Sequence, residues 1–240
     1  MSDVIWHDIE CGAYGADLPL WRALATLEAG PVLDVGAGVG RVALDLARHG
    51  HEVTALDRDP ELLAELAARA RAAGLEVRTE LADAAGFALP GPLFGLIAVP
   101  MQTIQLLPGR AARAAFLASA RDHLAAGGLV ALAVSEELEA FEVDPAAPVP
   151  PDRGERDGWR YLSFPVAVRP RGDVVVLERV RQAIAPDGSA STAGDAVELA
   201  SLSADELEAE AVEAGLRPEP RVFIPDTDLH VGSTVVMLRG

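Results

Sequence analysis

The sequence has very little of several residue types, and each shortage excludes a class of protein. Cys11 is the only cysteine among 240 residues, so neither an internal disulfide nor a thiolate metal site can form, and we expect a reducing compartment. The five histidines show no metal-ligand spacing, so we expect no metal. Basic residues are also few. Twenty Lys and Arg against 37 Asp and Glu give a net charge of −17, which argues against a nucleic-acid or anionic membrane partner.

Long apolar runs are absent as well. No stretch approaches the ~18 apolar residues of a membrane-spanning helix, and the first residues lack the apolar core of a signal peptide. We therefore expect a cytoplasmic protein whose partner is a small-molecule substrate. The sequence leaves the oligomeric state open, a homodimer included.

What the sequence does contain is a regular alternation of strand-like and helix-like segments. Helical spacing occurs at 41–50, 60–73, 110–125 and 203–214, and one or two further strands close the chain. Short apolar runs typical of strands occur at 31–35, 51–57, 75–81, 93–99 and 127–134. This order predicts an α/β fold with a doubly wound, mostly parallel sheet.

Residues 136–200 depart from that pattern. Residues 144–158 are rich in proline and charge and predict an irregular loop, whereas 159–168 and 173–184 have alternating stretches and predict an antiparallel pair. We therefore expect an insertion over 136–200, with 1–135 and 201–240 forming the main domain. Trp159, Tyr161 and Phe164 could line a pocket or form the core of the insertion, and both readings stay open.

The segment before the first strand divides into two halves. Leu18 to Leu27 have apolar residues at helical spacing and predict a helix on the sheet. The first half is too rich in glycine and polar residues to predict a stable helix.

The stretch "VLDVGAGVG" at 32–40 predicts a ligand-binding turn between a strand and a helix. A dinucleotide fingerprint needs glycine where this chain has Arg41, and Asp34 would repel a pyrophosphate while it could accept from an ammonium group. Asp57 ends the next strand, 21 positions after Gly36, where a carboxylate can accept both hydroxyls of a ribose. A nucleoside with an amino-acid tail, such as S-adenosylmethionine, satisfies both demands.

At these residues the sequence resembles the class I S-adenosylmethionine-dependent methyltransferases of the small-molecule type. The resemblance extends to "VTALDRDPELL" (53–63), "LADAAGFAL" (81–89), "FGLIAVPMQTIQLL" (94–107) and "HLAAGGLVALAV" (123–134). It implies a Rossmann-like seven-stranded sheet, an antiparallel insertion over the active site and an amino-terminal cover formed by residues 1–30. The implied cofactor-binding residues are Tyr14, Asp34, Gly36, Ala37, Gly38, Gly40, Asp57, Arg58, Asp83, Ala84, Val99 and Pro100.

Methyl transfer to a small metabolite, such as a natural-product intermediate, is the function that this resemblance implies. The fourth motif lacks the Asp-Pro-Pro-Tyr type of sequence found in many amino-methylating nucleic-acid enzymes, which favours small molecules further. The alternative is a protein of the same fold that catalyses a cyclisation or decarboxylation, or that acts as a binding partner. The catalytic residue is unknown, and the candidates for a general base are His7, Gln105, Tyr161 and His230. The sequence does not identify the substrate or the accepting atom.

Overall fold

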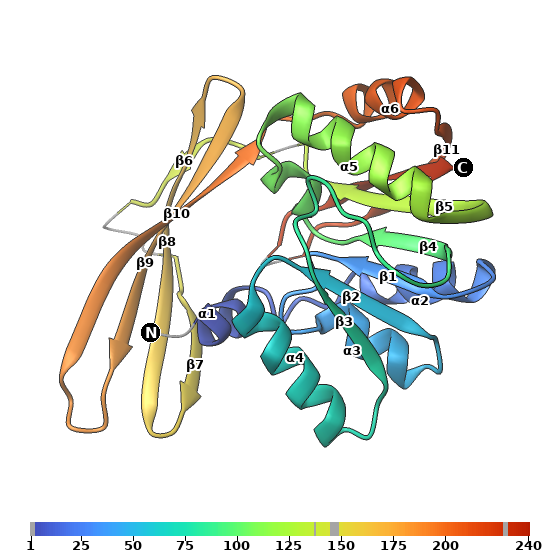
Figure 1. Ribbon diagram of the computed structural model, residues 1–240. Coiled ribbons are helices and arrows are strands. Elements are labelled where there is room, and N and C mark those ends of the chain that lie inside the picture. Colours follow the sequence, from blue (N-terminus) through green and yellow to red (C-terminus); the bar gives the residue numbers. More distant parts are fainter. Residues whose placement is uncertain (1–2, 137, 145–148, 228–229) are drawn as a thin grey trace. The chain divides into compact units, whose positions relative to one another are not determined.

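The chain divides into two units that interleave in sequence. The computed structural model describes residues 3–136, 138–144, 149–227 and 230–240. Residues 1–13 and 138–201 form one unit, here called the sheet unit, and residues 14–137 and 202–240 form the other, here called the core unit. Figure 1 shows the elements of both.

The core unit is built on a seven-stranded sheet of order β11-β12-β5-β4-β1-β2-β3. Within this order, the strands β5, β4, β1, β2 and β3 all run parallel to their neighbours. The strand β12 is antiparallel to both β5 and β11. Every residue of β1 and β4 is buried, as expected for central parallel strands covered on both faces. The strands are β1 (Val32–Val35), β2 (Val53–Asp57), β3 (Val77–Leu81), β4 (Phe94–Val99), β5 (Leu124–Val134), β11 (Arg217–Ile224) and β12 (Ser233–Arg239).

Helices pack along this sheet in two groups. The helices α5 and α6 contact each other and also β5 and β12, and both lie at the top of Figure 1. The helix α3 contacts α2 and β2, and α4 contacts β2 and β3. The bounds are α2 (Leu18–Leu27), α3 (Arg41–Arg48), α4 (Pro60–Ala72), the 3₁₀ turn η1 (Thr103–Leu106), α5 (Gly109–His123) and α6 (Ala204–Glu213). The predicted doubly wound, seven-stranded fold is confirmed.

Two of these helices begin at the capping residues that the sequence predicts. The Asp59 side chain caps α4 by accepting from the N–H groups of Glu61 and Leu62. Ser203 and Glu206 form a capping box at the start of α6. The predicted helix over Leu18–Leu27 is confirmed as α2. No helix in the described part of the chain has the length and apolar content to cross a membrane.

The sheet unit contains an antiparallel sheet of order β10-β9-β8-β6, in which β7 also pairs with β8. Its elements are α1 (Asp3–Glu10), β6 (Phe141–Glu142), β7 (Asp152–Arg156), β8 (Trp159–Arg171), β9 (Val174–Ile184) and β10 (Ala190–Ala200). The predicted antiparallel insertion after the fifth strand is confirmed, and the hairpin β8–β9 is the pair that the sequence predicts. The insertion has more strands than the predicted pair.

Two local predictions in this unit are wrong. The irregular loop expected over 144–158 contains the strand β7, because its backbone pairs with β8 from Asp152 to Arg156. The amino-terminal stretch expected to lack a stable helix forms α1, because Val4, Ile5 and Trp6 are buried. Tertiary burial therefore overrides a weak local preference in both places.

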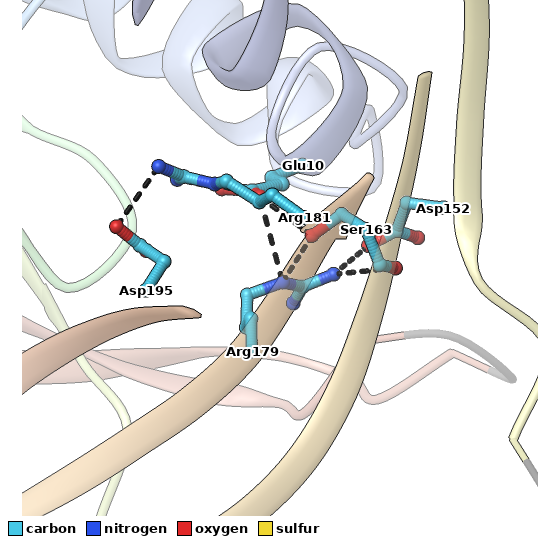
Figure 2. A network of polar contacts seen from close by, with 6 residues as sticks. All are labelled: Glu10, Asp152, Ser163, Arg179, Arg181 and Asp195. Carbon is cyan, nitrogen blue, oxygen red and sulfur yellow. Dashed lines mark hydrogen bonds and ion pairs between the residues drawn. The ribbon is translucent and has the colours of Figure 1, made fainter. Parts of the chain in front are cut away.

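A polar network fixes α1 to the sheet of this unit, as Figure 2 shows. Glu10 accepts from both Nε and Nη2 of Arg181, at 2.8 and 2.7 Å, and from the hydroxyl of Ser163 at 2.6 Å. Arg181 also donates to Asp195 at 2.9 Å, and Arg179 donates to Ser163 and Asp152. The partly buried carboxylate of Glu10 thus connects a helix at the start of the chain with strands more than 150 positions later.

Candidate functional site

The carboxyl ends of β1, β2 and β4 form the candidate site. The strand order reverses between β1 and β4, and ligands of open α/β sheets bind at the carboxyl ends of strands near such a reversal. The N–H groups of Gly36 and Ala37 both donate to the carbonyl of Leu56, which ties the loop after β1 to the end of β2. The glycine loop is therefore held by the neighbouring strand.

Three glycines give this loop its path. Gly36, Gly38 and Gly40 have φ values of 70°, 54° and 94°, in the left-handed region that other residues rarely adopt. A Cβ atom on Gly36 would lie 2.5 Å from Cγ2 of Thr103, and one on Gly40 would lie 2.7 Å from Cγ of Leu66. Glycine is thus required here both by backbone conformation and by close packing.

Asp34 supplies a buried carboxylate beneath the loop. Its Oδ2 accepts from the N–H of Ala43 at 2.9 Å, whereas its Oδ1 is buried and has no hydrogen-bond partner. Burial raises the pKa of Asp34 to about 7, although Arg41 and the Ala43 N–H lower it. A buried acceptor without a donor is costly, so Oδ1 is suited to a donor supplied by a ligand.

Asp57 stands at the end of β2 and contacts the same loop. Its Oδ2 accepts from the N–H of Gly38 at 2.8 Å, and its Oδ1 accepts from the N–H of Asp59 at 3.0 Å. Each carboxylate oxygen can accept a second hydrogen bond. Asp57 can therefore accept from a diol while it stays fixed by the backbone.

Tyr14 lies in a buried cluster beside the start of α3. The Arg41 guanidinium lies 5.1 Å from the centre of the Tyr14 ring and donates to its carbonyl oxygen at 3.1 Å. Arg41 also forms a two-pronged ion pair with the buried Asp17, at 2.5 and 2.7 Å. The His230 ring lies 4.7 Å from that of Tyr14. Burial, followed by the charge of Asp17, raises the pKa of Tyr14, so its hydroxyl stays a donor at neutral pH.

The end of β4 is held in a strained turn. Val99 and Pro100 are buried, and Met101 has a φ of 54° although it is not a glycine. The Thr103 hydroxyl donates to the carbonyl of Pro100 at 2.9 Å, and the Gln102 amide donates to the Ser135 hydroxyl at the same distance. The first bond closes the turn itself, and the second ties the turn to the end of β5.

Comparison with known proteins finds a family match within the core unit. Residues 32–128 match the family described as "Methyltransferase domain". Over these residues the chain matches a methyltransferase domain. An uncharacterized RNA methyltransferase of Parasynechococcus marenigrum is 40% identical over 60 residues, which are 25% of this chain and 13% of that protein. The chain spans at most 19% of the length of the curated relatives that it matches.

Solved structures resemble this chain over nearly its whole length. The sugar N-methyltransferase KedS8 from Streptoalloteichus has a TM-score of 0.75 at 19% identity, covering 99% of this chain and 92% of that one. CalS10, an amino pentose methyltransferase from Micromonospora echinaspora, has a TM-score of 0.66 at 23% identity, covering 98% and 92%. At these identities the likeness shows the fold.

The remaining predicted cofactor residues of the core unit also lie at the carboxyl ends of its parallel strands. Arg58 follows β2 and is exposed. Asp83 and Ala84 follow β3, and the N–H of Ala82 donates to the carbonyl of Asp57, which brings the two strand ends together. One oxygen of Asp83 accepts from the N–H of Ala85 at 2.8 Å, so this side chain also stabilises its own turn.

The four base candidates are distributed between the units. Gln105 and His230 belong to the core unit, whereas His7 and Tyr161 belong to the sheet unit. The Gln105 amide donates to the carbonyl of Ser135 and accepts from its N–H, so it fixes the end of β5. The Tyr161 ring packs edge-on against Trp6 at 5.5 Å. None of the four roles is tested by these contacts, and each stays a prediction.

Sequence reasoning missed Asp17, Arg41 and Thr103. The sequence position of Arg41 was informative, because a cation in the first turn of a helix interacts unfavourably with the helix dipole. Such a cation indicates that an anionic side chain lies nearby. Asp17 and Thr103 carried none, since only the fold brings them against Arg41 and Gly36.

Proposed function

We propose that this chain binds S-adenosylmethionine at the carboxyl ends of β1, β2, β3 and β4 and transfers its methyl group to a small metabolite. The observation that carries the proposal is the buried Oδ1 of Asp34, which has no hydrogen-bond partner and lies beneath a loop whose three glycines have positive φ. An ammonium group is the donor that best matches a buried carboxylate.

The chain's residues fit the parts of this cofactor. Asp34 and the loop from Gly36 to Gly40 would hold the amino-acid tail, with Tyr14 donating its hydroxyl to the carboxylate. Asp57 would accept from the ribose hydroxyls. Arg58, Asp83 and Ala84 would border the adenine, and Val99 with Pro100 would lie beside the sulfur.

The bound cofactor supplies a methyl group already activated by a positively charged sulfur. The protein then needs mainly to align the acceptor with the sulfur–methyl bond and to exclude water. The strained turn at Met101, tied to Ser135 through Gln102, would keep one wall of the site in place during this alignment.

The acceptor class that we propose is an amine or hydroxyl of a natural-product intermediate. The names of KedS8 and CalS10, a sugar N-methyltransferase and an amino pentose methyltransferase, support an amino sugar as the first compound to assay. As the new bond to the methyl carbon forms, its bond to sulfur breaks and the acceptor loses a proton. His7, Gln105, Tyr161 and His230 are the candidates to receive that proton.

Calorimetry of cofactor binding tests the assignment of Asp57. Asp57→Ala should weaken binding by ~1.5–3 kcal/mol for each strong hydrogen bond lost, or roughly 10- to 150-fold. Asp205→Ala, which removes a carboxylate that pairs with Arg221, is a matched control and should bind like the unmodified chain. Unchanged affinity in Asp57→Ala would contradict the assignment.

A product assay separates methyl transfer from the other uses of the same fold. Methyl transfer yields S-adenosylhomocysteine and a methylated acceptor in equal amounts. A cyclised or decarboxylated product formed without S-adenosylhomocysteine would identify a non-methylating enzyme. Cofactor binding without turnover across amine and hydroxyl acceptors would favour a binding partner.

A further inference from the structure

The segment between β3 and β4 begins with Asp83 and Ala84, which the proposed function places beside the adenine. The N–H of Ala82 donates to the carbonyl of Asp57 at 3.0 Å, which fixes the start of the segment. The N–H of Ala85 then donates to the Asp83 carboxylate at 2.8 Å and closes a turn. Because this bond lies within the turn, the position of the turn also depends on what holds the rest of the segment.

Past this turn the segment is held by α5, beside which it lies in Figure 1. The N–H of Phe87 donates to the Ser119 hydroxyl at 3.2 Å, and the N–H of Leu89 donates to Nε2 of His123 at 2.9 Å. In the described part of the chain, these two hydrogen bonds alone join residues 86–92 to another element. The buried Phe87 ring also lies 5.0 Å from the His123 ring. One imidazole therefore contacts the segment in two ways.

The contacts of His123 determine which ring nitrogen carries the hydrogen. A backbone N–H can only donate, so Nε2 accepts from Leu89 and carries no hydrogen. Nδ1 lies 2.7 Å from the carbonyl oxygen of Ser119, which can only accept, so Nδ1 carries the hydrogen. The neutral ring alone satisfies both contacts. A proton added to Nε2 would place two donors face to face.

The charged groups near His123 have other partners. Its own helix carries Arg121 and Asp122 directly before it, and these two pair with each other at 2.8 Å. On the segment, the carboxylate of Asp83 is bonded to its own turn. The strand β5, which starts directly after His123, has no charged residue. Within the described residues no carboxylate pairs with the imidazole, so a proton on Nε2 would lack a compensating acceptor.

We propose that neutral His123 is a positioning residue for the adenine of the cofactor, and that its protonation releases residues 86–92 and weakens adenine binding. The inference rests on the proposed function, which assigns the adenine to Asp83 and Ala84. Histidine ordinarily changes its charge between pH 5 and 8, so the release is expected in that range. Loss of one hydrogen bond predicts an affinity about fivefold lower.

Methylthioadenosine is the probe for this test. It has the adenine, ribose and sulfur of the cofactor but no ammonium group, so its affinity gains no ion pair with Asp34. His123→Gln places an amide oxygen near the position of Nε2, which can accept from Leu89 and does not titrate. His123→Phe keeps an aromatic ring beside Phe87 but has no acceptor.

Calorimetry with this probe at pH 8 and pH 5.5 compares the two ring states. At the higher pH the unmodified chain and His123→Gln should bind alike, and His123→Phe should bind about fivefold more weakly. At the lower pH the unmodified chain should fall to the level of His123→Phe, whereas His123→Gln should not. His51→Gln, at a histidine that precedes β2, is the matched control and should keep the pH dependence of the unmodified chain.

Amide exchange of the free chain tests the contact without a ligand. Protection of the Leu89 N–H, corrected for the intrinsic effect of pH on exchange, should fall at the lower pH in the unmodified chain but not in His123→Gln. If His123→Phe does not fold, these two proteins decide.

Equal pH dependence of affinity in the unmodified chain and His123→Gln would overturn the inference, as would unmodified affinity in a folded His123→Phe at the higher pH. Failure of the proposed function is distinguishable from these outcomes. In that case neither methylthioadenosine nor S-adenosylhomocysteine would bind at either pH, and the inference would fall with it.

Discussion

Asp34 combines two roles that oppose each other. Its Oδ2 caps the backbone at Ala43, which stabilises the fold, while its Oδ1 is buried without a donor. Burial raises the pKa of Asp34 from 3.8 to about 7, so the folded chain binds an extra proton between those values. The free energy of unfolding should therefore fall as the pH rises from about 4 to about 7. Above pH 7, a cationic group of a bound ligand would offset the free-energy cost of the buried, charged Asp34 carboxylate.

Cofactor binding should depend on pH through this residue. Below pH 7 the Asp34 carboxyl is largely protonated and offers no charge to an ammonium group, so the affinity for S-adenosylmethionine should rise between pH 6 and pH 8. Asp34→Asn keeps an acceptor for the Ala43 N–H but has no charge, so it should bind about tenfold or more weakly and lose most of this pH dependence. Calorimetry at both pH values measures the effect, and the same slope in both proteins would contradict it.

At the scale of single elements, the glycine loop and the η1 turn pack closely against each other. The loop after β1 approaches the η1 turn so closely that a Cβ atom on Gly36 would meet Cγ2 of Thr103 at 2.5 Å. The glycine spacing is visible in the sequence, but its partner 67 positions later is not, because only the parallel pairing of β1 with β4 brings the two turns together.

A double-mutant cycle tests this match. Gly36→Ala should destabilise the fold by about 1–3 kcal/mol, because it adds backbone strain at a φ of 70° and the contact with Thr103. In a Thr103→Ala background the same change should cost less, since the contact is removed and only the backbone strain remains. Denaturant unfolding gives all four free energies, and strict additivity would show that the turns are independent.

The helix α1 is the second case at this scale, because its anchor is polar. Burial raises the pKa of Glu10, but hydrogen bonds from Arg181 and Ser163 outweigh it, and the pKa is lowered from 4.5. The stability that this carboxylate contributes is therefore present above pH 4.5 and is lost as the pH falls below it. The sequence of α1 shows none of these partners.

Glu10→Gln should destabilise the sheet unit by about 3 kcal/mol, because it leaves Arg181 with less charge compensation in a partly buried site. Glu213→Gln is the control, since it removes the charge from an exposed ion pair with Arg110 and should change stability little. Thermal unfolding at pH 7 compares the two. Equal losses would show that the Glu10 network is only a surface feature.

At the scale of the whole molecule, the insertion stays a predicted cover. Trp159 and Tyr161 stack at 6.4 Å, and Trp6 packs edge-on against Tyr161, so these rings form one aromatic cluster of the sheet unit. If the cluster also lines the substrate pocket, Trp159→Ala should raise KM for the acceptor severalfold while cofactor affinity is unchanged. Steady-state kinetics in both substrates measures this, and an unaltered KM and turnover would leave the cluster with a packing role alone.

How much the sequence predicts depends on the range of the interactions. Apolar periodicity and caps such as Asp59 and Ser203 act within a few residues, so most elements of the core unit are found to within a few positions. The strand β7 and the helix α1 were missed because their stability comes from pairing and burial against distant segments.

The sequence by itself determined the α/β class, the glycine turn and the acidic strand ends, since each is a local pattern with a local physical cause. Only the tertiary structure decided that Asp17 pairs with Arg41, that Thr103 packs against Gly36, and that Glu10 pairs with Arg181. These features depend on which distant segments meet in space. Long-range pairing is set by the whole core at once, and no stretch of sequence encodes it alone.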